Sequence, residues 1–137
     1  MKVVHQMIHK FTGEPEKDGT VYAPDCIIQG LDQPVQVTYG FNEDIQLGTA
    51  DNLTVENGIL FADIDFTDTS KIIKGSYVVP AFEVIDPPYD PKEDWDAQLK
   101  KPIKEVKVVS FGCTIKPTIK DLKKLPKEIY ASNPCKL

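Results

Sequence analysis

Apolar and polar residues alternate through the middle of the chain, which is the period of a β-strand with one buried face. The clearest case is residues 59–67, where one side carries Leu60, Ala62, Ile64 and Phe66. The same pattern predicts strands at residues 2–12, 35–39, 76–85 and 104–113, and one beginning at residues 45–49. Asn57-Gly58 predicts a tight hairpin turn. The pattern therefore predicts a mainly β domain, either a small antiparallel β-barrel or a curled sheet.

Helical periodicity is confined to short segments. Residues 118–130 place apolar side chains at spacings of three, three and four, which predicts a short amphipathic helix interrupted by Pro126. A single helical turn around Trp95 is one interpretation of residues 86–102, and an irregular loop is the other. Residues 26–31 fit either a short helix or a strand. We expect one or two short helices in all.

Two further features concern loops and strand edges. The polar residues 42–44 (Asn-Glu-Asp) predict a loop after the strand at 35–39. Pro80 lies inside the predicted strand 76–85 and lacks a backbone N–H, so it indicates an edge strand or a bulge.

The length of 137 residues predicts one domain with a single core. Two parts of it differ in composition from the rest: an extended loop at 86–102, with four prolines and five acids, and a lysine-rich C-terminal tail at 118–137. No apolar run approaches the roughly 18 residues of a membrane helix, and the first ten residues lack the unbroken apolar run of a signal peptide. We therefore expect a protein made in the cytoplasm, without membrane partners.

The charge distribution argues against nucleic-acid binding. All 16 basic residues are lysine, so bidentate guanidinium contacts to phosphate or guanine cannot form, and the net charge is −5. Residues 1–99 carry 6 lysines and 18 acids, whereas residues 100–137 carry 10 lysines and 3 acids. Such asymmetry is typical of faces that meet different partners, although the two halves of one domain can also neutralise each other.

Few residues suggest chemistry. The only histidines, His5 and His9, are four residues apart, so they would share a face in a helix or in a regular strand; two ligands alone make a weak zinc site. Cys26, Cys113 and Cys135 are widely spaced and predict separate reduced thiols. The acids Asp63, Asp65 and Asp68 lack the glycine and distal glutamate of a calcium-binding loop, so we interpret them as a solvated strand face. No glycine-rich phosphate loop or other cofactor motif is present, so no cofactor and no metal are expected.

The order of these features resembles the maturation proteases of tailed-phage proheads, the assemblin-like serine proteases, over about residues 8–120. The stretches that carry the resemblance are FTGEPE, EKDGTVYAPDCI, PVQVTYG, IQLGTA and NGILFADIDF, followed by residues 79–82 and 105–110 with Pro117 downstream. The resemblance implies a protease-like β-barrel. It also implies that Tyr39 stands where the family has its catalytic histidine, and Val79 where it has its nucleophilic serine.

These departures decide the expected function. A phenol is a poor general base at neutral pH, and valine has no nucleophile. Another register places Ser110-Phe111-Gly112-Cys113 on the nucleophile motif, which makes Ser110 the alternative nucleophile, with His5 or His9 as its base. We expect a phage virion structural protein, an auxiliary, decoration or head-assembly subunit on an inactive protease-like fold. The alternative is a divergent maturation serine protease.

The expected partners are the major capsid protein or other head subunits, with self-association as a further option. Proline stiffens residues 86–102, which lowers the entropy lost when a partner orders them, and aromatic residues are frequent interface anchors. We predict partner contacts at Tyr89, Asp94, Trp95 and Asp96 in this loop, and at Lys120, Lys123 and Lys124 in the tail.

Overall fold

The computed structural model describes residues 1–16, 19–70, 76–85, 102–114 and 135–137. These residues form eight strands and no helix. The strands are β1 (Lys2–Lys10), β2 (Tyr22–Gln29), β3 (Val35–Tyr39), β4 (Asn42–Glu56), β5 (Ile59–Phe66), β6 (Tyr77–Val84), β7 (Ile103–Thr114) and β8 (Cys135–Lys136).

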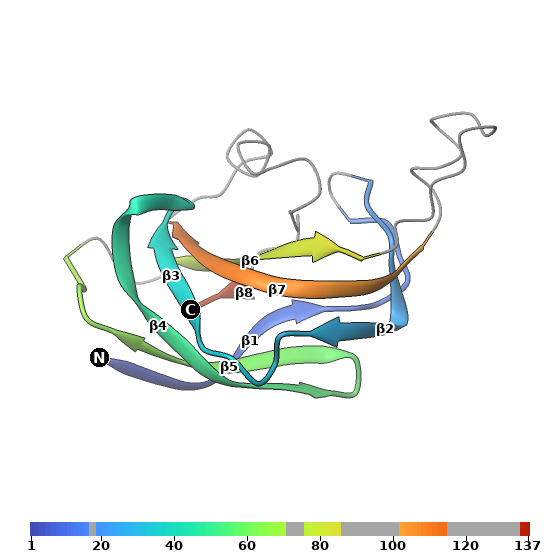
Figure 1. Ribbon diagram of the computed structural model, residues 1–137, viewed down its shortest axis with the longest axis horizontal. Helices are drawn as coiled ribbons and strands as arrows, with labels where there is room; N and C mark the ends of the chain where they lie inside the picture. Colours follow the sequence, from blue (N-terminus) through green and yellow to red (C-terminus); the bar gives the residue numbers. More distant parts are fainter. Residues whose placement is uncertain (17–18, 71–75, 86–101, 115–134) are drawn as a thin grey trace.

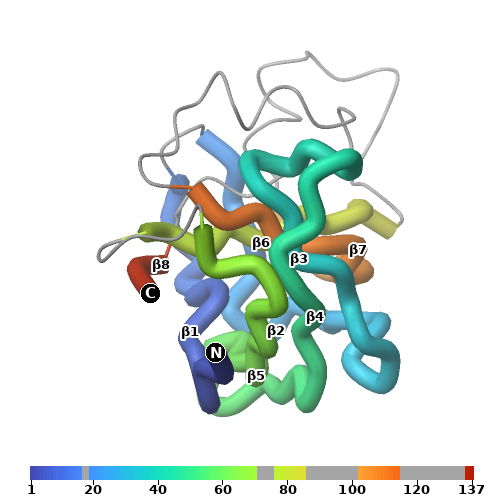
Figure 2. The backbone as a smooth tube through the Cα atoms, turned by 90° about the vertical axis from the view of Figure 1, so that its left-hand side faces the viewer, coloured from blue at the N-terminus to red at the C-terminus, as the bar shows by residue number. Residues whose placement is uncertain are grey.

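One sheet contains all eight strands and curls into a nearly closed barrel (Figure 1). The order is β1-β5-β4-β3-β7-β6-β8, with β2 also paired to β7. The 15-residue strand β4 bends from the β5 side of the barrel to the β3 side, as the tube in Figure 2 also shows. The predicted mainly β, barrel-like fold is confirmed.

Strand β7 is paired along both edges. On one edge it is antiparallel to β6, and on the other it is parallel first to β2 and then to β3. β2 and β3 therefore continue one another along β7, interrupted by residues 30–34, where Gly30 has a φ of +84°. The sequence analysis did not anticipate these two parallel pairings, because strand direction depends on pairing between segments about 75 residues apart.

The barrel interior is filled by the apolar faces of the strands. On β5 the predicted alternation holds: Leu60, Ala62, Ile64 and Phe66 are at most 2% exposed. The strands that surround this face contribute Ile8, Val37, Leu47, Val78, Phe82, Val106 and Phe111, all fully buried. Removing such side chains from water is the main stabilising contribution to the fold.

Several predicted elements can be compared directly with the structure. The strand predicted at residues 35–39 has these bounds, and those predicted at 2–12, 76–85 and 104–113 are present within one to two residues. Residues 26–29 belong to a strand, which decides between the two interpretations of 26–31. The helix predicted at 118–130 and the turn around Trp95 lie outside the described residues, as do the loop 86–101 and nearly all of the tail.

The loop predicted at residues 42–44 is wrong, because the turn is shorter than the polar run suggested. Tyr39 pairs with Asn42, so Gly40 and Phe41 alone form the turn, with φ values of +57° and +62°. Phe41 is an unusual residue for this conformation. A Cβ added to Gly112 would lie 2.7 Å from the Phe41 ring, so the ring packs closely over this glycine of β7. This long-range contact accounts for the positive φ of Phe41, which the local sequence does not signal.

Pro80 lies beyond the part of β6 that pairs with β8, so its missing N–H removes no hydrogen bond of that ladder. β8 pairs with β6 only at Tyr77 and Val78, so Pro80 is beyond that short ladder, and a bulge follows it between Ala81 and Phe82. The edge or bulge predicted from Pro80 is therefore present. The Asn57-Gly58 turn is also present, with both residues at positive φ, as a two-residue hairpin turn of this kind requires.

No ladder joins β1 to β6 among the described residues, so the barrel has a seam there. The short strand β8 covers one end of this seam: the Gln6 side-chain amide donates a 3.0 Å hydrogen bond to the Lys136 carbonyl. Farther along the seam, side chains alone connect the two strands. Phe82 of β6 lies 5.4 Å, ring centroid to centroid, from His9 of β1 and 5.7 Å from Phe11.

Gly48 permits the close approach of β4 and β5. A Cβ at this position would lie 2.1 Å from the Asp65 carbonyl oxygen and 2.9 Å from the Phe66 Cα, both backbone atoms. We predict that Gly48→Ala lowers the free energy of unfolding by about 1–3 kcal/mol, because the strands must separate locally. Urea denaturation measures this. The neighbouring exposed substitution Thr49→Ala should change stability by no more than about 0.5 kcal/mol; equal effects of both would contradict the prediction.

Candidate functional site

The three positions compared with protease catalytic residues lie on three adjacent strands. Tyr39 is on β3, Ser110 on β7 and Val79 on β6. Along β7, Tyr39 is paired with Cys113 and Val79 with Gly112. Segments 40 residues apart in the chain therefore meet on either side of β7.

Tyr39 and Val79 do not share a face of the sheet. Directly paired residues point to the same face and successive residues alternate, so Tyr39 shares its face with Cys113 and with Val78, which also pairs with Cys113. Tyr39 packs against the barrel core, to which Val78 belongs, whereas the fully buried Val79 is outside that core cluster. The geometry thus provides no convergent slot for a base at 39 and a nucleophile at 79.

Ser110 also lies apart from both histidines. It pairs with Ala81 of β6, is half-buried, and makes no side-chain hydrogen bond within the described part of the chain. His5 and His9 are both on β1, and each contacts a glutamate. Within these residues, neither histidine is brought into contact with Ser110; that no catalytic pair forms remains a prediction.

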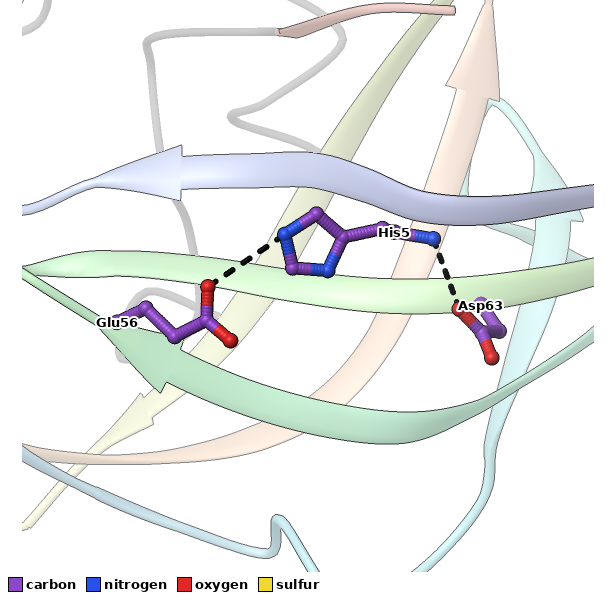
Figure 3. A network of polar contacts seen from close by, with 3 residues as sticks. All are labelled: His5, Glu56 and Asp63. Carbon is purple, nitrogen blue, oxygen red and sulfur yellow. Dashed lines mark hydrogen bonds and ion pairs between the residues drawn. The ribbon is translucent and has the colours of Figure 1, made fainter.

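His5 belongs to an exposed cluster on the outer face of β1, β5 and β4 (Figure 3). Its ring stacks on Phe61 with a centroid distance of 4.0 Å and an interplanar angle of 9°. His5 Nε2 lies 3.5 Å from Glu56 Oε2, and both side chains are more than half exposed. A pair so exposed contributes little to stability.

Asp63, at one end of the cluster drawn in Figure 3, connects two β-bulges. On β1, Val4 and His5 together oppose Asp63, and the His5 N–H donates a 2.8 Å hydrogen bond to Asp63 Oδ1 (Figure 3). On the other flank, β4 bulges at Asn52, whose side-chain amide donates to Asp63 Oδ2 at 2.9 Å. His5 and Asn52 are both non-glycine residues at positive φ, +54° and +51°.

The same two hydrogen bonds lower the pKa of the Asp63 carboxyl. The hydrogen bond from the His5 backbone, followed by that from the Asn52 side chain, lowers the pKa of this carboxyl below its usual 3.8. Each of these donors favours the charged form. Asp63 therefore has a defined structural role as a hydrogen-bond acceptor for two bulges. We had expected the acids of this region only to form a solvated strand face.

His9 is buried, whereas His5 is exposed. A second bulge on β1 leaves two residues, Ile8 and His9, opposite Leu60, and both are 0% exposed. The expectation that His5 and His9 share a face is therefore wrong, because the bulges break the strand period between them. His9 Nε2 lies 3.3 Å from Glu16 Oε2, at side-chain exposures of 0% and 3%, although the contact is not an aligned hydrogen bond.

The cysteines are separate thiols, as expected. Burial raises the pKa of Cys26 and of Cys113 to about 11, with the charges of Asp25 and Glu105 adding to the effect at Cys26. Burial also raises the pKa of Cys135, with a lowering effect from Lys10 and a further raising effect from Glu16. Thiols in this state are poor nucleophiles near neutral pH.

Within the described residues, no three His, Cys, Asp or Glu side chains are grouped so that they could hold a metal ion. In the same residues no helix has the length and apolarity to cross a membrane. The residues predicted to contact partners lie outside the described part of the chain: Tyr89, Asp94, Trp95, Asp96, Lys120, Lys123 and Lys124.

Comparison with known proteins gives no match, whether to a family model, to a curated protein or to a solved structure.

Sequence reasoning identified His9 but not its partner. Glu16 lies seven residues later, beyond the end of β1, and nothing in the sequence distinguishes it from Glu14. Only the folded structure shows that Glu16, and not Glu14, is the partner of His9. Pro15 bridges to Val21, and the Glu16 backbone bonds to Thr20 and Gly19 in a closed turn that places the carboxylate against the barrel seam.

We predict that Asp63→Ala destabilises the protein near neutral pH, because two bulges lose their shared acceptor. The folded-state pKa of Asp63 is lowered, so its contribution is fully present above 3.8 and is lost as the pH falls through the folded-state value. The difference in free energy of unfolding between wild type and Asp63→Ala should therefore shrink in strong acid.

Urea denaturation at several pH values measures this difference. Asp65→Ala is the matched control, since Asp65 is exposed two residues farther along β5 and its side chain has no hydrogen bond or ion pair in the described structure. The role assigned to Asp63 is excluded if its alanine variant is no less stable than the control.

Proposed function

We propose that this protein is a structural component of a phage virion, acting as a capsid-binding auxiliary, decoration or head-assembly subunit. The phage context rests on the resemblance in order between this chain and prohead maturation proteases. A β-barrel is the fold that this resemblance implies, but many unrelated functions share such barrels, so the fold alone does not carry the proposal.

The observation that favours a structural role over an enzymatic one is the engagement of both histidines away from Ser110. Serine hydrolysis needs a base within hydrogen-bond reach of the nucleophile. His5 stacks on Phe61 beside Glu56, and His9 is enclosed with Glu16 inside the barrel. Each imidazole would have to leave these contacts before it could activate a hydroxyl on β7.

The positions of Tyr39 and Val79 favour the same conclusion. Tyr39 packs against the core and Val79 is completely buried, so both act as packing residues. The capsid partner is proposed to be contacted through residues 86–102 and the lysine-rich tail. Their aromatic and oppositely charged residues fit anchoring and electrostatic steering onto charged head subunits.

The absence of protease chemistry can be tested with a serine-reactive fluorophosphonate probe. We expect no labelling of Ser110, with an active serine protease as the positive control, and unchanged capsid maturation in the variant Ser110→Ala. Labelling of Ser110 that disappears in His5→Gln or His9→Gln would instead establish the alternative, a divergent maturation protease.

The virion role can be tested by deleting residues 88–99, which removes both Tyr89 and Trp95. We expect a folded domain whose copy number in purified heads falls roughly tenfold or more, because losing one anchor typically costs about 2 kcal/mol. The variant Asp65→Ala, changed on an exposed position of β5, should join heads normally. Normal incorporation of the shortened chain would show that this loop is not the anchor, and absence of the full chain from virions would exclude the virion role.

A further inference from the structure

The seam between β1 and β6 encloses a histidine and a glutamate whose side chains have no hydrogen-bond partner within the described residues. His9 Nδ1 and Nε2 and both Glu16 carboxylate oxygens are buried and make no aligned hydrogen bond with any group of the described structure. Among the ion pairs of the described residues, each of these side chains contacts the other, with His9 Nε2 3.3 Å from Glu16 Oε2. Buried polar groups without hydrogen bonds are rare in folded proteins, and each one calls for a physical explanation.

Aromatic rings surround the His9 side of the pair. The His9 ring makes edge contacts with Phe11, Tyr22 and Phe82, at centroid distances of 4.7, 5.3 and 5.4 Å. These rings come from the segment after β1, from β2 and from β6. The pair therefore lies at the place where three parts of the chain meet without a ladder between β1 and β6.

A pair in this environment is stable only when its net charge is zero. With one proton shared between imidazole and carboxylate, the pair is either two opposite charges or two neutral groups. A second proton leaves a buried positive charge, and loss of the proton leaves a buried negative charge, both without a counter-ion. Burial of an unpaired charge is strongly unfavourable.

We propose that His9 and Glu16 form a proton-controlled latch on the barrel seam: the seam is closed while the pair holds one proton, and it opens when the pair gains or loses one. This goes beyond the proposed function, and it does not depend on it. Opening lets water reach the pair and separates β1 from β6, which only side chains and the short strand β8 hold together. The ladders of β3, β4 and β5 remain intact.

Among the described residues, other titratable groups also lie on the elements around the pair. Tyr22 of β2 contacts the His9 ring, Cys135 of β8 senses the charge of Glu16, and Lys10, next to His9, is exposed. On β6 the neighbouring Glu83 is exposed. Phenols and buried thiols gain charge well above neutral pH, so of the groups named here that are not exposed, the pair is the one whose proton count, once it is exposed to water, changes between about pH 4 and pH 7.

The protein contains its own matched control. His5 and Glu56 are the same two residue types, one of them on the same strand, at a similar distance of 3.5 Å, but exposed by 54% and 56%. Water solvates either of these groups when its partner loses charge. The latch hypothesis therefore requires a response from the buried pair and none from the exposed one.

The test is amide hydrogen exchange of the full chain between about pH 3.5 and pH 8, a range that includes the ordinary pKa values of glutamate and histidine, about 4.3 and 6.5. Protection factors, corrected for intrinsic exchange, are compared between the seam strands β1 and β6 and the strands β3–β5. We expect seam protection to be greatest between about pH 4.3 and pH 6.5, where the opened pair also holds one proton, and to fall by up to about tenfold per pH unit above and below this window, as one linked proton requires. Protection of β3–β5 should stay constant.

Two double variants separate the pairs. In His9→Gln/Glu16→Gln, which cannot titrate, seam protection should be independent of pH; in His5→Gln/Glu56→Gln it should follow the wild-type profile. The proposal is overturned if the wild-type profile is flat, or if the buried-pair variant keeps the wild-type profile. Should the buried-pair variant fail to fold, the His9 ring resonances of the wild type decide: they must shift over the same pH range in which seam protection falls, and a shift without loss of protection overturns the latch.

Discussion

The barrel closes on side chains, not on backbone hydrogen bonds, and this constraint governs much of its structure. From β1 through β5, β4, β3 and β7 to β6, each strand is held by a ladder to the next, but in the described part of the chain no ladder joins β1 to β6. Closure then depends on β8, on the Gln6 contact and on the aromatic cluster of Phe11, Tyr22 and Phe82 around His9. Apolar packing of this kind is non-directional, so it tolerates the irregular approach of two strands that could not form a regular ladder.

The irregularity of β1 comes from its two bulges. Each bulge inserts one residue, increases the local twist and turns the strand around the barrel. Asp63 accepts hydrogen bonds from the bulges on both of its flanks, so one carboxylate stabilises the curvature of β1 and β4 together. The bulges also send the two histidines of one strand into opposite environments. Identical residue types thereby acquire different physical roles, a solvated surface pair and an enclosed pair.

The positions of Tyr39 and Val79 in the barrel bear on the proposed function. A barrel in which Tyr39 and Val79 face opposite sides of the sheet has no site where the two would act together, whatever residues occupied them. The outer face of β6 and β7 is nevertheless buried at Val79 and Ala81 and packed by Phe41 over Gly112. These positions contribute to packing, which is compatible with a subunit whose role is to bind other proteins.

The local sequence specifies the fold class, the hairpin at Asn57-Gly58 and the buried face of β5, because strand period and turn conformation depend on residues close together in the chain. It did not determine the direction of β2 and β3 along β7, the start of β4 at Asn42, or the partner of His9. The turn at Gly40-Phe41 depends on a ring packing against a glycine some 70 residues away, and the His9–Glu16 contact depends on a bulge created by pairing with β5. Only the tertiary structure decided these features, since each arises from contacts between segments whose meeting no local pattern records.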